Sequence, residues 1–163
     1  YPRRVASMAE PEVEALSGAR ARGMKLRVDQ GEHVVEDVVF AKMDPDFDTV
    51  EDVGSDGQVV FRRVLDGDLR YFAVSRGSVF ASAGWEYVRA TSILETVALR
   101  YSDGKLEGVL EALAGGVEVT LRYPGLRQVE VDGEEVTPIA SGPDHITFYL
   151  TEGQHVVDGR SRY

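Results

Sequence analysis

Hydrophobic and polar residues alternate along much of the chain. The segments VEVTLRY (117–123) and HITFYL (145–150) alternate without a break. Neighbouring side chains of an extended strand point to opposite faces, so this period of two predicts strands with one buried and one solvated face. Such strands are typical of antiparallel sheets. The segments KLRVD (25–29) and HVVEDVVFAKM (33–43) are also strand-like, with Gly31 in the turn between them.

Asp-Gly pairs separate many of these segments. They occur at residues 56–57, 66–67, 103–104, 132–133 and 158–159. A type I′ turn needs a positive φ at both central residues, which Asp and Gly tolerate, so Asp-Gly between two strand-like segments predicts a tight hairpin. The clearest predicted hairpins are VVFRRVLDGDLRYFAV (59–74) and VEVDGEEV (129–136).

Two segments have helical features. Residues 8–22 (MAEPEVEALSGARAR) carry glutamates early and arginines late, which suits a helix dipole, so we predict a helix there. Residues 105–116 (KLEGVLEALAGG) place apolar residues at a spacing that fits either a helix or a strand. We favour the strand, because the neighbouring segments are hairpins and Gly108 weakens a helix.

Together these elements predict a mostly β fold. We expect an antiparallel β-sandwich of about ten to twelve short strands with one N-terminal helix. The expected organisation is a linker helix over residues 1–24, a β-sandwich domain over residues 25–157 and a flexible tail over residues 158–163. A chain of 163 residues suits one domain. Because it begins with Tyr1 rather than Met, we expect it to be a piece of a longer chain.

Composition excludes several classes of function. With 28 acidic and 18 basic residues the net charge is −10, which repels nucleic acid and anionic lipid. Basic residues are scattered, and Arg62 and Arg63 are expected on opposite faces of one strand. The absence of cysteine excludes disulfides, a thiolate nucleophile and Cys-ligated zinc. No apolar run is long enough to span a bilayer, so we expect neither a nucleic-acid partner nor membrane insertion.

The most acidic segment is MDPDFDTVEDVGSDG (43–57). Closely spaced carboxylates in a loop can supply several of the oxygen ligands that Ca²⁺ requires. The candidate metal ligands are Asp44, Asp46, Asp48 and Asp52. The segment departs from an EF-hand loop, because Thr49 stands in place of the turn glycine and Ser55 in place of the bidentate glutamate. The alternative interpretation is a solvated acidic loop between strands.

A set of aromatic residues offers a possible binding platform. The candidate carbohydrate-binding residues are Tyr71, Trp85, Tyr87 and Arg89. Trp85, Tyr87 and Arg89 are two residues apart, so strict alternation predicts that they share one face of a strand. Sugars bind to aromatic platforms flanked by polar and charged groups. The alternative is that Trp85 lies in the hydrophobic core.

Common catalytic motifs are absent from the sequence. It contains no Ser-x-x-Lys, no G-x-S-x-G and no P-loop. His33, His145 and His155 lie far apart and lack the spacing of a metal-binding motif. An acid–base or metal site assembled from different strands, in a small all-β enzyme, is an open alternative.

The order of the central segments resembles a known family. The chain runs through VVFAKM, a short acidic segment, SDGQVVFRR, DGDLRYFAVSRGSVF and ATSILETVALRYSDGKLEGVLEA, and then VEVTLRYPG and VEVDGEEV. Over residues 38–136 this order resembles the later part of the C-terminal β-sandwich region of heparinase II/III-like polysaccharide lyases. In that family the β region follows a helical toroid, and the helix predicted at residues 8–22 would be its remnant.

The resemblance implies a function without catalysis in this chain. Such lyases carry their catalytic Tyr and His on the toroid and on an early segment rich in His, Asp and Gly, which is not found here, so no catalytic residue is carried over. It implies a non-catalytic accessory domain of a larger carbohydrate-active protein, packing on the catalytic domain or contacting polysaccharide. The alternative is a stand-alone binding module stabilised by calcium. Either would be extracellular or at the cell surface, and the net charge disfavours acidic glycans as direct ligands.

Overall fold

A computed structural model describes residues 10–161, and strands form all the regular structure of that range. The strands in chain order are β1 (Glu12–Ser17), β2 (Ala21–Asp29), β3 (Val34–Lys42), β4 (Asp48–Val50), β5 (Val53–Ser55), β6 (Val59–Leu65), β7 (Asp68–Ser82), β8 (Trp85–Ser102), β9 (Lys105–Ala112), β10 (Val117–Arg122), β11 (Leu126–Val131), β12 (Glu134–Glu135), β13 (Ala140–Ser141), β14 (His145–Leu150) and β15 (Gly153–Ser161). Each recorded strand pair in this range is antiparallel. The mostly β, antiparallel class predicted from the alternation is therefore confirmed.

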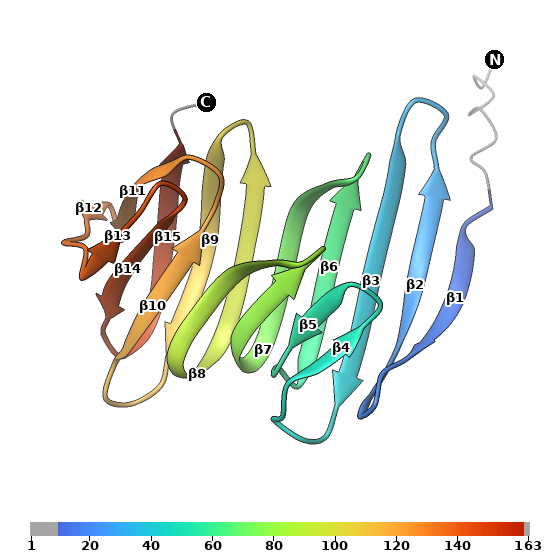
Figure 1. The fold of residues 1–163 in the computed structure, drawn as a ribbon, viewed down its shortest axis with the longest axis horizontal. Helices are drawn as coiled ribbons and strands as arrows, with labels where there is room; N and C mark the ends of the chain where they lie inside the picture. Colours follow the sequence, from blue (N-terminus) through green and yellow to red (C-terminus); the bar gives the residue numbers. More distant parts are fainter. Residues whose placement is uncertain (1–9, 162–163) are drawn as a thin grey trace, which may run out of the picture.

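The described strands belong to one hydrogen-bonded sheet. Its longest path, which we call the main layer, has the order β1-β2-β3-β6-β7-β8-β9-β15-β11-β12. The other strands join the end of β7 and the start of β8 in a smaller second layer, in the order β4-β5-β7-β8-β10-β14-β13. This second layer lies in front of the main layer in Figure 1. The expected sandwich of two sheets is thus replaced, over residues 10–161, by a single open sheet that turns back over itself.

The two longest strands, β7 and β8, enter both layers because they bend. Arg76, in the middle of β7, has a φ of 53°, which is unusual for a residue with a side chain. Gly77 follows it, and a Cβ there would lie 2.7 Å from the Cα of Gly57. The pairing of β7 with β8 changes register between Gly77 and Val79, and the pairing of β8 with β9 changes register between Leu94 and Thr96. Bulges of this kind bend a strand, so they carry the chain from one layer to the other.

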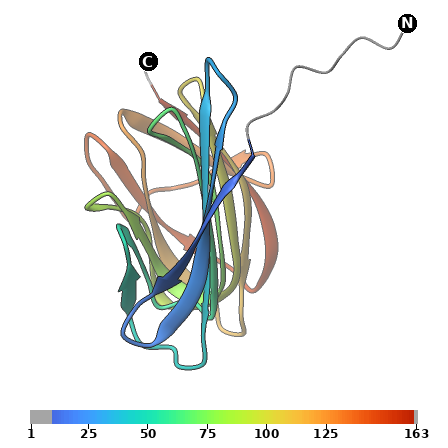
Figure 2. The same cartoon turned by 90° about the vertical axis from the view of Figure 1, so that its right-hand side faces the viewer.

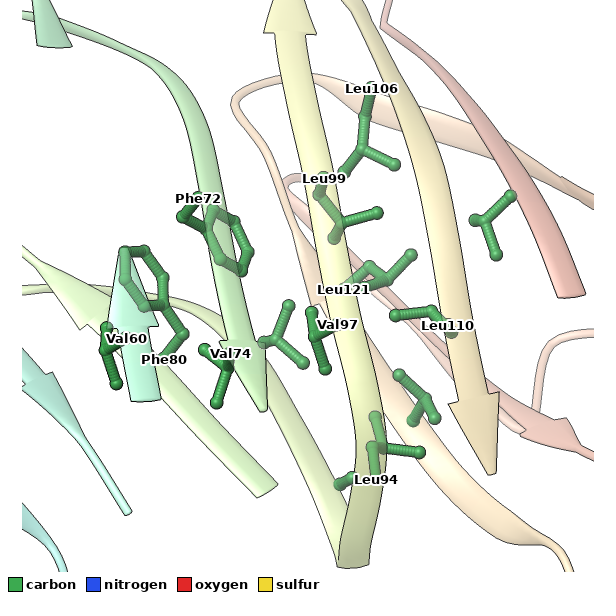
Figure 3. Close-up of a cluster of buried hydrophobic side chains, with 14 of the residues drawn as sticks. Val60, Phe72, Val74, Phe80, Leu94, Val97, Leu99, Leu106, Leu110 and Leu121 are labelled. Atoms are coloured by element: carbon green, nitrogen blue, oxygen red, sulfur yellow. The ribbon is translucent and has the colours of Figure 1, made fainter. Parts of the chain in front are cut away.

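The hydrophobic core fills the space between the two layers (Figure 3). The main layer contributes Val60, Phe72, Val74, Val97, Leu99, Leu106 and Leu110, and the second layer contributes Phe80 and Leu121. The rings of Phe72 and Phe80 are stacked, with centroids 3.8 Å apart. Both belong to β7, on either side of its bend, so one strand supplies a contact between the layers.

Three of the Asp-Gly pairs form the predicted hairpin turns. They join β6 to β7, β8 to β9 and β11 to β12. The φ angles of Asp66, Asp103 and Asp132 are 53°, 47° and 54°, and the glycine that follows each of them also has a positive φ. These are the values that a type I′ turn requires, so the hairpins predicted over residues 59–74 and 129–136 are confirmed.

The other two Asp-Gly pairs do not form hairpin turns. The pair at residues 158–159 lies inside β15, where both residues pair with β9. At the pair at residues 56–57, the Asp56 carboxylate accepts hydrogen bonds from the amides of Ser78 and Val79, at 2.8 and 2.9 Å. An Asp-Gly pair is compatible with a tight turn but does not require one. At both pairs, contacts with neighbouring strands determine the conformation instead.

The helix predicted over residues 8–22 is wrong for residues 10–22, the part of it that the structure describes. These residues form β1 and the start of β2, which pair along their length. Their turn is fixed by a distant residue, because the Asp48 carboxylate accepts hydrogen bonds from the amides of Arg20 and Ala21, at 2.7 and 3.0 Å. A contact with a residue so far along the chain is not visible in local charge patterns.

At residues 105–112 the structure forms β9, which confirms the favoured strand. Leu106 and Leu110 are buried against the core. A Cβ on Gly108 would lie 2.0 Å from the carbonyl oxygen of Ala98 in the neighbouring strand, so the close approach of the two backbones requires glycine there. Strands also cross the boundaries expected at residues 24 and 158, because β2 and β15 each continue through them.

Candidate binding surfaces

The side of the main layer that faces away from the second layer, which we call the outer face, is rich in apolar residues. Residues paired across neighbouring strands share a face, so the strand register identifies its members. Over β1, β2, β3, β6 and β7 they include Val13, Met24, Leu26, Val28, Val35, Val39, Val59, Phe61, Tyr71 and Ala73. Val13, Met24 and Val59 are 66%, 51% and 47% exposed. In Figure 2 the second layer lies on one side of these strands, and no described strand covers the outer face.

Two of these strands, β3 and β6, carry apolar residues on their inner face too, whereas β2 places Lys25 and Arg27 there. Val38, Phe40 and Val60 point inward and are fully buried. A strand that is apolar on both faces is typical of a sheet that is covered on both sides. The charged residues in the middle of the outer face neutralise each other, because Arg63 donates two hydrogen bonds to Asp37, at 2.7 and 2.6 Å. The outer face therefore has the character of an interaction surface.

The opposite, inner face carries a groove where the second layer ends. In Figure 1 the upper parts of β3 and β6 extend beyond β4 and β5. Two adjoining hollows of about 410 and 280 Å³ lie on this inner face. Leu69 and Tyr87 line both hollows, which are therefore neighbours, and we call the two together the tyrosine groove.

One end of the tyrosine groove is built around the buried side chain of Arg62, which is 2% exposed. Its guanidinium donates to both carboxylate oxygens of Asp52, at 2.6 Å, and to Glu36, at 2.6 Å. It also donates to the Ser82 hydroxyl at 3.1 Å. Lys25 lies beside this cluster, 3.3 Å from Glu36. Arg62 and Arg63 thus point to opposite faces, as the alternation predicted.

The other end of the groove is lined by three tyrosines. The ring of Tyr101 lies 5.6 Å from that of Tyr87 and 5.0 Å from that of Tyr123. The Tyr101 hydroxyl is buried and has no hydrogen-bond partner among the described residues. Burial raises the pKa of this phenol well above its usual range, so the hydroxyl stays protonated and can both donate and accept.

The structure does not bring the four predicted carbohydrate-binding residues together. Tyr71 lies on the outer face, 5.7 Å from the ring of Phe61, whereas Tyr87 lies in the groove. Arg89 points away from buried Val88 and hydrogen-bonds to Glu86. Trp85 stands at the exposed start of β8 and is 38% exposed.

A bulge explains this separation. The pairing of β7 with β8 shifts register opposite Tyr87, so Tyr87 and Val88 both face the core and the alternation reverses. Strict alternation placed Tyr87 and Arg89 on one face, and a single extra residue moved them to opposite faces. The other members of the groove, Tyr101 and Tyr123, lie in strands and turns that are distant in sequence and were not predicted as site residues.

The four candidate calcium ligands are all engaged by groups of the protein itself. Asp44 and Asp46 lie beside the guanidinium of Arg20, and Asp52 binds Arg62. The carboxylate of Asp48 accepts three amide hydrogen bonds, and the segment itself folds into the small β4–β5 hairpin. No group of three or more His, Cys, Asp or Glu side chains suited to a metal ion occurs within residues 10–161.

We expect Asp48 to make stability depend on pH. The amide of Arg20, followed by those of Thr49 and Ala21, holds the pKa of this carboxyl below its usual value, although burial acts in the opposite direction. A lowered pKa stabilises the fold above the unfolded value of about 3.9, and this contribution is lost as the pH falls through the folded value. Urea unfolding of the protein and its Asp48→Asn variant should therefore differ at pH 6 and converge towards pH 2.5. A difference that stays constant with pH would contradict this role.

The histidines are separate, and two of them belong to a repeated arrangement. His33 Nδ1 lies 2.6 Å from Asp66, and the next amide, that of Val34, donates to the same carboxylate. His155 and Val156 bind Asp132 in the same way, with a His155–Asp132 distance of 2.7 Å. Both aspartates begin hairpin turns, so each histidine ties two adjacent strand ends together. The repeated Gly-x-His-Val-Val at residues 31–35 and 153–157 is the sequence signal of this arrangement.

None of the residues that the structure describes forms a helix long and apolar enough to span a bilayer. No model of a known protein family matches the chain, and no curated protein matches it.

Proposed function

We propose that the chain is a non-catalytic accessory β domain of a larger carbohydrate-active protein, of the heparinase II/III-like polysaccharide lyase type. In this proposal its outer face packs on the catalytic domain of that protein, which acts outside the cell or at its surface. The folded-over part of the sheet serves as the second sheet of a sandwich. The observation that carries the proposal is the apolar outer face, which includes β3 and β6, two strands that are also apolar inside.

The physical argument is that the outer face is costly to leave in water. Burying apolar surface contributes roughly 25 cal/mol for each Å², and the exposed side chains of the outer face spread over five adjacent strands. A flat sheet face packs well against another layer at a distance of about 10 Å. The paired charges of Asp37 and Arg63 can be covered together, so no unpaired charge at the centre opposes docking.

The side chains of the chain also support a non-catalytic role. His33 and His155 are held by Asp66 and Asp132 at strand ends, where they fasten turns. These histidines lie at different ends of the main layer and do not converge on one site. We therefore assign them to the architecture of the sheet rather than to acid–base chemistry.

Photo-crosslinking in the natural gene product tests this function. With p-benzoylphenylalanine in place of Val59 on the outer face, we expect crosslinks to peptides of the catalytic domain. Tyr149, which is 56% exposed in β14 of the second layer, is the matched control position and is expected to give none. A gene product without a further domain, or equal crosslinking from both positions, would overturn the proposal.

A further inference from the structure

The sheet has a long edge, formed by β1, that no described strand covers. β1 pairs with β2 through six consecutive residue pairs without a bulge, and its other side has no strand partner within residues 10–161. The strands at the other ends of the sheet, β12, β13 and β4, have only two, two and three residues. Short edge strands protect a sheet against pairing with another chain, whereas a regular strand of this length can accept a further strand.

Every second backbone amide of β1 points to this free side, which we call the β1 edge. The amide of Gly18 donates to the carbonyl of Ala21 across the β1–β2 turn, at 3.1 Å. Hydrogen-bonded and non-hydrogen-bonded residue pairs alternate along an antiparallel ladder, so the even-numbered residues of β1 direct their amides towards β2. Val13, Ala15 and Ser17 therefore direct their N–H and C=O groups outward, where an added strand would bond to them.

The two faces of β1 have different chemistry. Val13 and Ala15 lie on the apolar outer face, and Val13 is 66% exposed. Glu12 and Glu14 lie on the inner face. A strand added at the β1 edge would extend both faces of the sheet. Its side chains therefore have to alternate between apolar groups and groups that suit neighbouring carboxylates.

The inner side of the β1 edge has an excess of negative charge. Glu10, Glu12, Asp29 and Arg27 line a hollow of about 90 Å³ there, so three carboxylates share one guanidinium. That guanidinium lies 3.7 Å from the carboxylate of Glu12. Glu14 adds a further carboxylate, which has no ion pair among the described residues. A lysine or arginine side chain is the complement of this hollow and of its surroundings.

We infer that the β1 edge binds an extended segment of a partner protein in which basic and apolar residues alternate. The main chain of the segment bonds to the outward groups of β1, its basic side chains meet the acidic inner side, and its apolar side chains lie beside Val13 and Ala15. A second copy of the chain does not fit, because antiparallel pairing of two β1 strands brings their glutamates together on one face. This inference goes beyond the packing of the outer face and does not depend on it.

Titration of the 163-residue chain with a peptide of alternating lysine and valine, about eight residues long, tests the inference. We expect the peptide to shift the amide signals of β1 and to slow hydrogen exchange at Val13 and Ala15. A peptide of alternating glutamate and valine is the control and should bind at least roughly tenfold more weakly. Equal binding of the two peptides, or no shift of β1 at about 1 mM peptide, would overturn the inference. Shifts of β1 that depend on protein concentration without peptide would identify a second copy as the occupant and would also overturn it.

Charge-reversal variants separate the β1 edge from the overall charge of the protein. Glu14→Lys reverses one charge on the acidic side, so we expect the affinity for the lysine peptide to fall roughly tenfold. Glu118→Lys, in β10 of the second layer, makes the same change in net charge and is expected to alter the affinity by less than about twofold. Unchanged affinity in Glu14→Lys, or equal losses in both variants, would contradict the assignment.

A proline variant tests the backbone contacts. Ala15→Pro removes an outward N–H, and proline is tolerated in an edge strand where the N–H faces away from the sheet. We expect the melting temperature to be largely kept and peptide binding to be lost. Retained binding in Ala15→Pro would show that the peptide does not add a strand. Because none of these variants alters Val59, failure here leaves the crosslinking test of the packing role unaffected.

Discussion

Replacing Phe72 by alanine is expected to lower the free energy of unfolding by about 4 kcal/mol. Phe72 is fully buried, and its ring is stacked on that of Phe80 at 3.8 Å. It also lies 5.9 Å from the ring of Tyr101 and 6.2 Å from that of Tyr87. The substitution removes this ring from the centre of the core and leaves a cavity between the two layers, which cannot close without moving β7.

Chemical unfolding monitored by circular dichroism measures this effect. Tyr71→Ala is the matched control, because Tyr71 precedes Phe72 in β7 and lies on the outer face. We expect this control to lose about 1 kcal/mol, as is typical of a partly exposed residue. Similar losses in the two variants would show that the layers are not held together through Phe72.

Replacing Arg62 by alanine is expected to cost about 3 kcal/mol, because it removes one partner of a buried ion pair and leaves the others uncompensated. Arg62 is 2% exposed and makes its hydrogen bonds to Asp52, Glu36 and Ser82. Without the guanidinium, two carboxylates face each other across the groove. Water reaches Asp52, whose side chain is 43% exposed, so the cost stays at the lower end of the range for buried pairs.

Arg63→Ala is the matched control for the Arg62→Ala variant. Arg63 pairs with Asp37 on the outer face, and its side chain is 50% exposed. This pair is only half exposed, because the Asp37 side chain is 14% exposed, so Arg63→Ala is expected to cost about 1 kcal/mol, less than Arg62→Ala. Urea unfolding of the protein and both variants measures the two losses. If the two variants lose equal stability, burial of Arg62 is not the reason for its importance.

Much of the fold follows from local features of the sequence. The strands at residues 117–122 and 145–150 come from alternation, and the turns at Asp66, Asp103 and Asp132 come from the φ angles that Asp-Gly allows. Both signals depend on residues within a few positions of each other, so they can be read without knowing the tertiary structure.

The predictions that failed depend on distant residues. The segment that became β1 and the start of β2 has the charges of a helix, but pairing in the sheet and the hydrogen bonds from Arg20 and Ala21 to Asp48 decide its conformation. The Asp-Gly pair at residues 158–159 is held straight by β9. Local preferences of about 1 kcal/mol per residue or less are easily outweighed by such contacts.

The candidate site also combines features that follow from local sequence with features that depend on contacts between distant residues. The sequence suggested a platform of four residues, Tyr71, Trp85, Tyr87 and Arg89, of which only Tyr87 lines the groove. It did place Arg62 and Arg63 on opposite faces. It could not identify the groove, because Tyr87, Tyr101 and Tyr123 come from different strands and turns and meet only after β7 and β8 have bent. The bulge beside Tyr87 also reversed the face on which Arg89 lies.

By itself, the sequence determined an acidic, antiparallel β chain with well-defined hairpins, because alternation and turn geometry are local properties of the backbone. The tertiary structure alone decided which faces are covered and which charges are paired. The bends at Arg76 in β7 and between Leu94 and Thr96 in β8 place the second layer over one side of the main layer and leave the other side bare. The physical reason is that burial and ion pairing depend on strands that meet across long stretches of chain, and a single bulge reverses the pattern that follows it.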